Sequence, residues 1–219
     1  MNLAAPETEP PVIAGNVYPK YHTRNPIARR LVAGFLAAFR ELTDLSGAEN
    51  VLEVGCGEGF LSGILAAPGR RIRGIDISPA VIEIARRNPD LAARDIAFEV
   101  ASVYDLDPLA DAAELVICCE VLEHLKEPER ALGLLAKLAS PYLLVSVPRE
   151  PLWRILNIMR GRYLADFGNT PGHLQHWSRR SFLGSLARYV DIVEVKTPLP
   201  WTMALCRSRH PDSHVRTTG

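Results

Sequence analysis

The stretch VLEVGCGEGF, residues 51 to 60, decides the fold, because an apolar run ends at an acid and passes into a glycine-rich turn. Gly55, Gly57 and Gly59 take three of its last six positions. A buried strand, a bare loop and a helix in this order form the edge at which open α/β sheets bind ligands. Because glycine has no side chain, we expect a ligand to lie against the backbone of this turn.

The rest of the chain alternates between extended and helical patterns. Asn25 and Pro26 precede apolar residues at helical spacing, which predicts a first helix with Asn25 as its N-cap. Strands are predicted at 50–55, 71–77, 96–101, 113–119 and 142–147, helices at 59–67, 79–88, 127–139 and 178–188, and a final hairpin at 190–196 and 201–207. Strands separated by helices pair in parallel, so the pattern predicts an α/β domain. That domain spans 18–207, with mobile ends at 1–17 and 208–219.

Composition narrows the range of partners and locations. Lysine plus arginine balances aspartate plus glutamate, 25 against 25, so no general positive field favours nucleic acid. The four cysteines have no CxxC spacing, which predicts reduced, buried thiols. The start of the chain shows neither a signal peptide nor a membrane span, and a cytoplasmic location is therefore expected.

The turn differs from a dinucleotide-binding fingerprint. Phe60 stands where the third glycine of GxGxxG would be, and Glu53 and Glu58 would repel a phosphate. Asp76 ends the second predicted strand, about 20 residues further on, where an acid accepts hydrogen bonds from ribose hydroxyls. These residues predict a nucleoside ligand without a pyrophosphate, either cationic or neutral.

The motifs EVGCGEG, GIDIS and EVLEHL together resemble those of the class I S-adenosylmethionine-dependent methyltransferases, over residues 50 to 206. The resemblance implies a Rossmann-like, seven-stranded, mostly parallel sheet with helices on both faces and an antiparallel last strand. It implies that the methionine part of S-adenosylmethionine lies near Gly55, Cys56 and Gly57, and its ribose on Asp76. The remaining implied cofactor residues are Glu53, Gly59, Ile77, Ser78, Ser102, Val103 and Glu120. Ser102 departs from the family pattern, which usually has an acid there.

A second group of polar residues follows the fourth predicted strand. Glu120, Glu123 and His124 would share one face if their turn is helical, and such ligands suit a divalent cation. The string is similar to the Glu-x-x-Glu-His turn of metal-dependent small-RNA 2′-O-methyltransferases and ubiquinone-pathway O-methyltransferases. In those proteins a later histidine completes the site, which implies His173 here and leaves His176 as a neighbour. The alternative is a site without metal, in which His124 or His173 is the general base.

The segment 149–176 is predicted to be a lid-like insertion, with Leu152, Ile155, Leu156 and Met159 on one helical face and Arg149, Arg154, Arg160 and Arg162 around it. Three interpretations stay open: a cap over an apolar or acidic substrate, an ordinary surface helix, or a peripheral contact with anionic lipid. Near the start, Tyr18, Tyr21 and His22 either cover the cofactor or anchor the surface.

The predicted function is S-adenosylmethionine-dependent methylation of a small-molecule acceptor at a hydroxyl, with an amine or a carbon as the alternative accepting atom. His124, His173 and Glu120 are the candidate catalytic residues. The alternatives are RNA 2′-O-methylation and a non-catalytic S-adenosylmethionine-binding protein. The sequence leaves the acceptor, the oligomeric state and the presence of a metal open.

Overall fold

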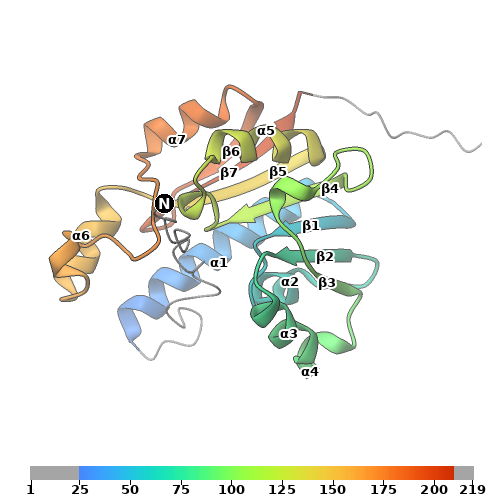
Figure 1. The fold of residues 1–219 in the computed structure, drawn as a ribbon, viewed down its shortest axis with the longest axis horizontal. Helices are drawn as coiled ribbons and strands as arrows, with labels where there is room; N and C mark the ends of the chain where they lie inside the picture. Colours follow the sequence, from blue (N-terminus) through green and yellow to red (C-terminus); the bar gives the residue numbers. More distant parts are fainter. Residues whose placement is uncertain (1–24, 210–219) are drawn as a thin grey trace, which may run out of the picture.

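The computed structural model describes residues 25–209 (Figure 1). The predictions for residues 1–17, for Tyr18, Tyr21 and His22, and for most of the C-terminal tail lie outside the described residues. Asn25 is the N-cap of the first helix, as predicted, because its side chain accepts hydrogen bonds from the backbone N–H groups of Ile27 and Ala28.

Seven strands form one sheet in the order β3-β2-β1-β4-β5-β7-β6. Their bounds are β1 Asn50–Val54, β2 Arg71–Asp76, β3 Ile96–Val100, β4 Ala113–Cys119, β5 Ala139–Pro148, β6 Val190–Lys196 and β7 Trp201–Ser208. Strands β1 to β5 pair in parallel, and β7 runs antiparallel to both β5 and β6. The predicted fold class is confirmed. The strand order reverses between β1 and β4, which is the point where ligands bind in such sheets.

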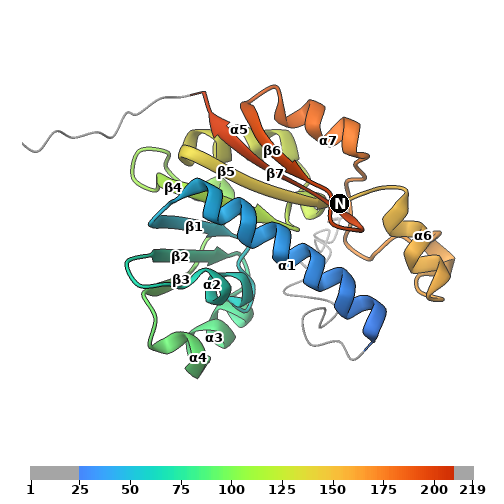
Figure 2. The same cartoon turned by 180° about the vertical axis from the view of Figure 1, so that it is seen from behind.

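Helices cover both faces of the sheet (Figures 1 and 2). They are α1 Pro26–Ser46, α2 Phe60–Leu65, α3 Pro79–Arg87, α4 Pro89–Ala92, α5 Pro128–Leu138, α6 Leu152–Met159 and α7 Arg179–Leu186, with 3₁₀ turns η2 Val103–Asp105, η3 Leu122–His124 and η4 Leu164–Asp166. No helix in the described part of the chain is both long and apolar enough to cross a membrane.

The core lies on both sides of the sheet because side chains alternate along each strand. Val51 packs with Phe39 of α1, whereas the next residue, Leu52, belongs to the cluster that holds Leu135 of α5 and Phe182 of α7. Strands covered on both faces are apolar almost throughout, which explains the uninterrupted runs in the sequence. All four cysteines are free and buried, as predicted.

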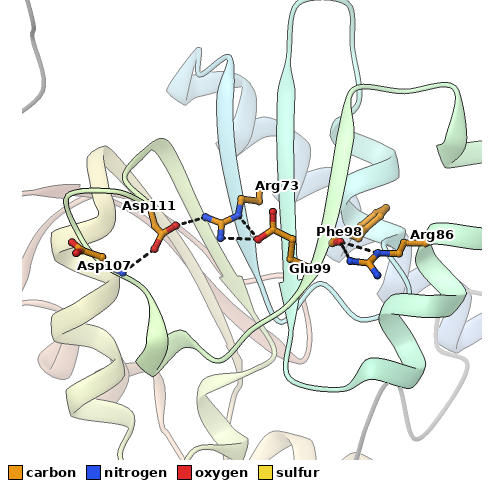
Figure 3. A network of polar contacts seen from close by, with 6 residues as sticks. All are labelled: Arg73, Arg86, Phe98, Glu99, Asp107 and Asp111. Atoms are coloured by element: carbon orange, nitrogen blue, oxygen red, sulfur yellow. Dashed lines mark hydrogen bonds and ion pairs between the residues drawn. The ribbon is translucent and has the colours of Figure 1, made fainter.

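A charged network joins the strands at the β3 edge of the sheet (Figure 3). The Arg73 guanidinium donates to Glu99 Oε2 on β3 through Nε at 3.0 Å and Nη2 at 2.8 Å, and its Nη1 pairs with Asp111. Arg86 of α3 donates to the carbonyl oxygen of Phe98 at 2.7 Å. These contacts satisfy groups on the edge strand and connect it to the loop that precedes β4.

The segment between β5 and α7 leaves the sheet and returns to it beside its starting point, and it is called the excursion. At its base Arg149 forms a bridge with Trp177, and Glu150 N donates to Trp177 O at 2.8 Å. The excursion contains α6 and η4, which project away from the sheet in both views (Figures 1 and 2). Its returning segment carries His173 to the turn that follows β4.

Candidate functional site

The glycine turn folds tightly at the C-terminal end of β1. The N–H groups of Gly55 and Cys56 both donate to Ile75 O, at 2.8 and 2.9 Å, which fixes the turn beside β2. Gly55, Gly57 and Gly59 have φ angles of 74°, 54° and 77°. Residues with a side chain rarely adopt this left-handed region, so the backbone itself favours glycine at each position.

The three glycines differ in what surrounds them. A Cβ at Gly55 would lie 2.2 Å from Val121 Cγ2, and one at Gly59 would lie 2.6 Å from Phe98 Cζ. At Gly57 a Cβ would meet no atom of residues 25–209 within 4 Å. The expectation of bare backbone for a ligand therefore fits Gly57, whereas the missing side chains of Gly55 and Gly59 make room for protein neighbours.

Asp76 holds the turn through both carboxylate oxygens. Its Oδ2 accepts from Gly57 N at 3.0 Å and its Oδ1 from Ser78 N at 2.9 Å. A carboxylate offers about four acceptor positions, so these two bonds leave capacity for ribose hydroxyls. Ile77, between them, is exposed at this edge, while Ser78 is buried. The predicted ribose role remains a prediction, and the structure adds a role in shaping the turn.

Two groups beneath the turn have altered acidity. Glu53 is buried and accepts a hydrogen bond from Ser62 Oγ, and burial raises its pKa to about 7. Burial also raises the pKa of the Cys56 thiol, and the charges of Glu53 and Asp76 add to this. A cationic ligand at this edge would favour the ionised form of Glu53. The thiol stays neutral, and Cys56 serves as a small packing residue.

The residues predicted to contact adenine lie after β3. Ser102 Oγ accepts from Tyr104 N at 3.2 Å and thereby caps η2. Val103 is buried in the core. The Ser102 hydroxyl thus has a local structural use, and contact with adenine stays a prediction for both residues.

Glu123, His124 and His173 form a cluster that can hold a metal ion. One ligand atom from each residue lies within 4.8 Å of the other two. Glu123 and His173 are buried, and His124 is exposed to solvent. Glu123 and His124 come from η3, which follows β4, whereas His173 lies on the irregular segment between η4 and α7. The positions of these residues in the sequence do not by themselves predict that His173 lies beside Glu123 and His124.

Hydrogen bonds attach the irregular segment that contains His173 to η3. The carbonyl oxygen of Glu123 accepts from Leu174 N at 2.7 Å and from Gln175 N at 3.1 Å. The side chain of Gln175 donates to Leu125 O at 3.0 Å. His124 Nδ1 lies 2.9 Å from Gly172 O. A carbonyl only accepts, so Nδ1 carries the proton, and Nε2 has the lone pair that can bind a metal or take up a proton.

Aromatic rings pack against the cluster. The ring centroids of His124 and His173 are 5.0 Å apart, and the Trp153 ring stacks on His173 with centroids 5.9 Å apart. Trp153 also contacts the edge of Trp201 and donates to Thr170 Oγ1 at 2.9 Å. This packing fixes the His173 ring, as is typical of residues that orient metal or proton-transfer groups.

Glu120 occupies a different place from the one predicted. It has a φ of 61°, and η3 begins only at Leu122, so Glu120 does not share a helical face with Glu123 and His124. Its carboxylate accepts from Trp201 Nε1 at 2.6 Å and from Ser146 Oγ at 3.3 Å. Within residues 25–209 the candidate metal cluster contains Glu123, His124 and His173 and does not contain Glu120.

Several residues that shape the site escaped prediction from the sequence. Val121 contacts the Gly55 position, Trp201 and Ser146 hold Glu120, and Trp153 stacks on His173. Each of these contacts joins residues far apart in the sequence or requires a particular side-chain rotamer. Spacing in the sequence therefore does not indicate them. His176 Nε2 lies 2.8 Å from Asn169 Oδ1, and His176 lies outside the cluster. The sequence had predicted it as a neighbour of the ligands and not as a ligand.

The sequence model of a family described as a methyltransferase domain matches residues 22–189. The chain belongs to this methyltransferase family. A ubiquinone biosynthesis O-methyltransferase of Xanthomonas oryzae is 31% identical over 148 residues, which cover 66% of this chain and 59% of that protein. One of Alkalilimnicola ehrlichii is 31% identical over 180 residues, covering 78% of this chain and 69% of that protein. This chain thus matches about six tenths of the length of the Xanthomonas relative.

Solved methyltransferase structures share the fold. The magnesium protoporphyrin IX methyltransferase of Synechocystis, determined with bound S-adenosylhomocysteine, aligns with a TM-score of 0.64 at 21% identity over 84% of this chain and 88% of that one. The methyltransferase domain of a bacterial CtHen1 aligns with a TM-score of 0.58 at 22% identity, over 81% and 99%. The predicted resemblance to class I methyltransferases is confirmed.

Proposed function

We propose that this methyltransferase moves the sulfonium methyl group of S-adenosylmethionine onto a hydroxyl of a small-molecule acceptor, leaving S-adenosylhomocysteine. The contact between Val121 and the Gly55 position carries this proposal. Val121 directly precedes η3, so the glycine turn and the cluster of Glu123, His124 and His173 are neighbours at one edge of the sheet. A methyl donor in the turn would stand beside groups able to activate an acceptor.

The turn suits the cofactor chemically. Among the described residues no atom would meet a Cβ at Gly57 within 4 Å, and the Asp76 carboxylate has acceptor positions for ribose hydroxyls. The carboxylates of Glu53 and Asp76 favour a cationic ligand over a pyrophosphate, and S-adenosylmethionine carries a sulfonium. Placing the two reactants in line supplies much of the rate of a methyl transfer, because the sulfonium is already activated.

The cluster suits a divalent cation by its donor set. One carboxylate and two imidazoles are ligands for manganese, iron or zinc, and three protein ligands leave coordination positions open. Glu123, His124 and His173 would hold the ion, with His124 contributing Nε2. When bound, such an ion lowers the pKa of an acceptor hydroxyl. If the protein works without metal, His124 Nε2 is the base, because Nδ1 donates to Gly172 O.

A small molecule is favoured over RNA as the acceptor. The formal charge of the chain is zero, whereas RNA binding is driven by positive charge that releases counterions. The two curated relatives are named as ubiquinone biosynthesis O-methyltransferases, and this name does not give the acceptor of the present chain. We extend from them only the acceptor class, a hydroxyl of a small molecule, and we expect a cytoplasmic location.

The test combines binding and turnover. We expect Glu123→Gln and His173→Ala to abolish manganese binding in calorimetry and methyl transfer to a panel of hydroxyl acceptors, while S-adenosylhomocysteine affinity stays within about twofold. His176→Ala is the matched control, because this histidine lies outside the cluster. Turnover that survives chelation but falls in His124→Ala would replace the metal by a histidine base. Salt-sensitive methylation of RNA, or cofactor binding without turnover on any acceptor, would contradict the proposed function.

A further inference from the structure

A buried indole holds the carboxylate of Glu120. Trp201 Nε1 donates to Glu120 Oε2 at 2.6 Å, and Ser146 Oγ donates to Glu120 Oε1 at 3.3 Å. Trp201 is 4% exposed and Ser146 is fully buried, so both donors lie in the core. An indole N–H can only donate, and a buried one requires an acceptor. The position of the Glu120 carboxylate is therefore set by two neighbours inside the protein.

Contacts on several sides fix the Trp201 ring. Trp201 is the first residue of β7 and pairs with Pro148, the last residue of β5. Its ring meets Phe35 of α1 edge to face, with centroids 5.1 Å apart, and Trp153 of α6 at 5.7 Å. Trp201 N donates to Pro198 O at 2.6 Å. Because the sheet and two helices hold this ring, the direction of its N–H group is fixed before any ligand binds.

The backbone of Glu120 is adapted to this hydrogen bond. Its φ of 61° lies in the left-handed region, which is unfavourable for a residue with a side chain. Glu120 N donates to Ser146 O at 3.1 Å, which continues the pairing of β4 with β5 by one residue. A strained conformation persists only where its surroundings maintain it. Here the bonds from Trp201 and Ser146 do so.

Glu120 lies three residues before Glu123, and a carboxylate is a suitable ligand for a divalent cation. Within the described residues, however, the metal-binding group is Glu123, His124 and His173, with ligand atoms within 4.8 Å of one another. If the Glu120 carboxylate moved to this group, the buried indole N–H of Trp201 would lose its acceptor, which is unfavourable. The hydrogen bond from Trp201 thus opposes recruitment of Glu120 as a fourth ligand.

Three ligands and four ligands give an ion different chemistry. A structural metal site is closed by its protein ligands, whereas a catalytic one keeps a position open for water or substrate. Each carboxylate ligand also offsets one of the two positive charges, so a second carboxylate would weaken the effect of the ion on an acceptor hydroxyl. With Glu123 as the one carboxylate ligand, the site keeps both an open position and a net positive charge.

We propose that Trp201 is a positioning residue, which holds Glu120 out of the metal cluster and so keeps a coordination position open for the acceptor oxygen. This inference rests on the proposed function, since it requires a divalent cation at Glu123, His124 and His173. Trp201 acts through Glu120, and the hydrogen bond between them persists when the ion is bound.

The indole N–H signals in a nuclear magnetic resonance spectrum of the full chain report this hydrogen bond. The chain has three tryptophans, and Trp201→Phe identifies the signal of Trp201 by its removal. We expect Glu120→Gln to move that signal upfield, because a neutral acceptor replaces a charged one. Saturation of the wild type with zinc, which is diamagnetic, should leave the signal in place. A zinc-dependent upfield shift as large as that in Glu120→Gln would overturn the proposal.

Manganese calorimetry and turnover give the second test. Glu120→Gln should bind manganese within about twofold of the wild type, whereas Glu123→Gln should lose binding. Trp201→Phe keeps an aromatic ring but removes the donor, so Glu120 becomes available to the ion. Manganese affinity should then rise about tenfold and turnover should fall about tenfold. Adding Glu120→Gln to Trp201→Phe should reverse the gain in affinity and restore at least part of the turnover.

Trp177→Phe is the matched control, because Trp177 packs on Phe182 with ring centroids 6.0 Å apart and lies outside the cluster. It should change neither affinity nor turnover. Equal losses of manganese binding in Glu120→Gln and Glu123→Gln would make Glu120 a ligand and overturn this inference alone. If Glu120→Gln did not restore turnover in Trp201→Phe, Trp201 would have a packing role only. A wild type that binds no divalent cation would instead overturn the metal site of the proposed function together with this inference.

Discussion

Neighbouring glycines in one turn serve different purposes. Gly55 and Gly59 make room for Val121 and Phe98, whereas Gly57 opens onto space beside the Asp76 carboxylate. Substitution at Gly57 should therefore affect ligand binding more than folding, and substitution at Gly59 should affect both. The difference comes from the neighbours, because the backbone conformation is left-handed at all three.

We expect Gly57→Ala to cost only the strain of a left-handed side chain, about 1–2 kcal/mol, and to weaken S-adenosylhomocysteine binding at least tenfold. Gly59→Ala should lose more stability, because its Cβ would also collide with Phe98. Urea unfolding and calorimetry measure the two effects. Unchanged affinity in a folded Gly57→Ala protein would remove the turn from the cofactor site.

The buried carboxyl of Glu53 makes stability depend on pH. Its pKa is raised from about 4.5 to about 7 by burial, so its contribution is fully present below pH 4.5 and is lost as the pH rises through 7. We expect Glu53→Gln to match the cofactor-free wild type near pH 4 and to exceed it by up to about 3 kcal/mol near pH 8. Urea unfolding at both values tests this. Equal unfolding free energies at pH 8 would show that Glu53 ionises freely in the fold.

At the scale of elements, the glycine turn after β1 and the 3₁₀ turn η3 after β4 are in direct contact. Parallel neighbours end at the same edge of a sheet, which brings these turns together. The contact passes through one side chain, Val121, which fills the space at Gly55. A substitution in one turn should therefore change ligand binding at the other turn as well.

We expect Gly55→Ala to weaken both cofactor binding and manganese binding, because the new Cβ would displace Val121 and with it Glu123 and His124. Val121→Ala removes the colliding methyl groups, so the double variant should regain at least part of both affinities. Calorimetry on the two single variants and the double variant gives the coupling. Purely additive losses would mean that the two turns act independently.

For the molecule as a whole, charges at the β3 edge connect the sheet to the loop before β4. The pKa of Asp111 is lowered: burial acts to raise it, but the Asp107 N–H bond and the Arg73 guanidinium outweigh that effect. A lowered pKa stabilises the fold above the ordinary value near 3.8, and this stabilisation is lost as the pH falls through the lowered value.

We therefore expect Asp111→Asn to lower the free energy of unfolding by about 1 kcal/mol near pH 7, and by less in acid, as the pH falls through the lowered pKa of Asp111. Glu83→Gln is the control, because the side chains of its pair with Arg87 are 50% and 79% exposed. It should change stability little at either pH. A loss in Asp111→Asn that persists undiminished in acid would assign the effect to packing.

The sequence by itself determined the order and type of the elements, because these depend on local signals. Strands and helices fall within a few residues of their predicted places, and Asn25 caps the first helix as expected. The exception within the predicted site was the turn after β4. Because Glu120 has a positive φ, the 3₁₀ turn η3 begins only at Leu122. The i, i+3 and i+4 spacing of Glu120, Glu123 and His124 does not indicate that angle.

Only the tertiary structure decided which side chains meet. His173 reaches Glu123 because the excursion is closed at Trp177 and its returning segment forms hydrogen bonds to η3. The partners of Glu120, the packing of Val121 on Gly55 and the outward face of α6 likewise depend on contacts between residues far apart in the chain. Local propensity acts over a few residues, whereas such contacts exist only once the loops have closed and their entropic cost is offset by packing.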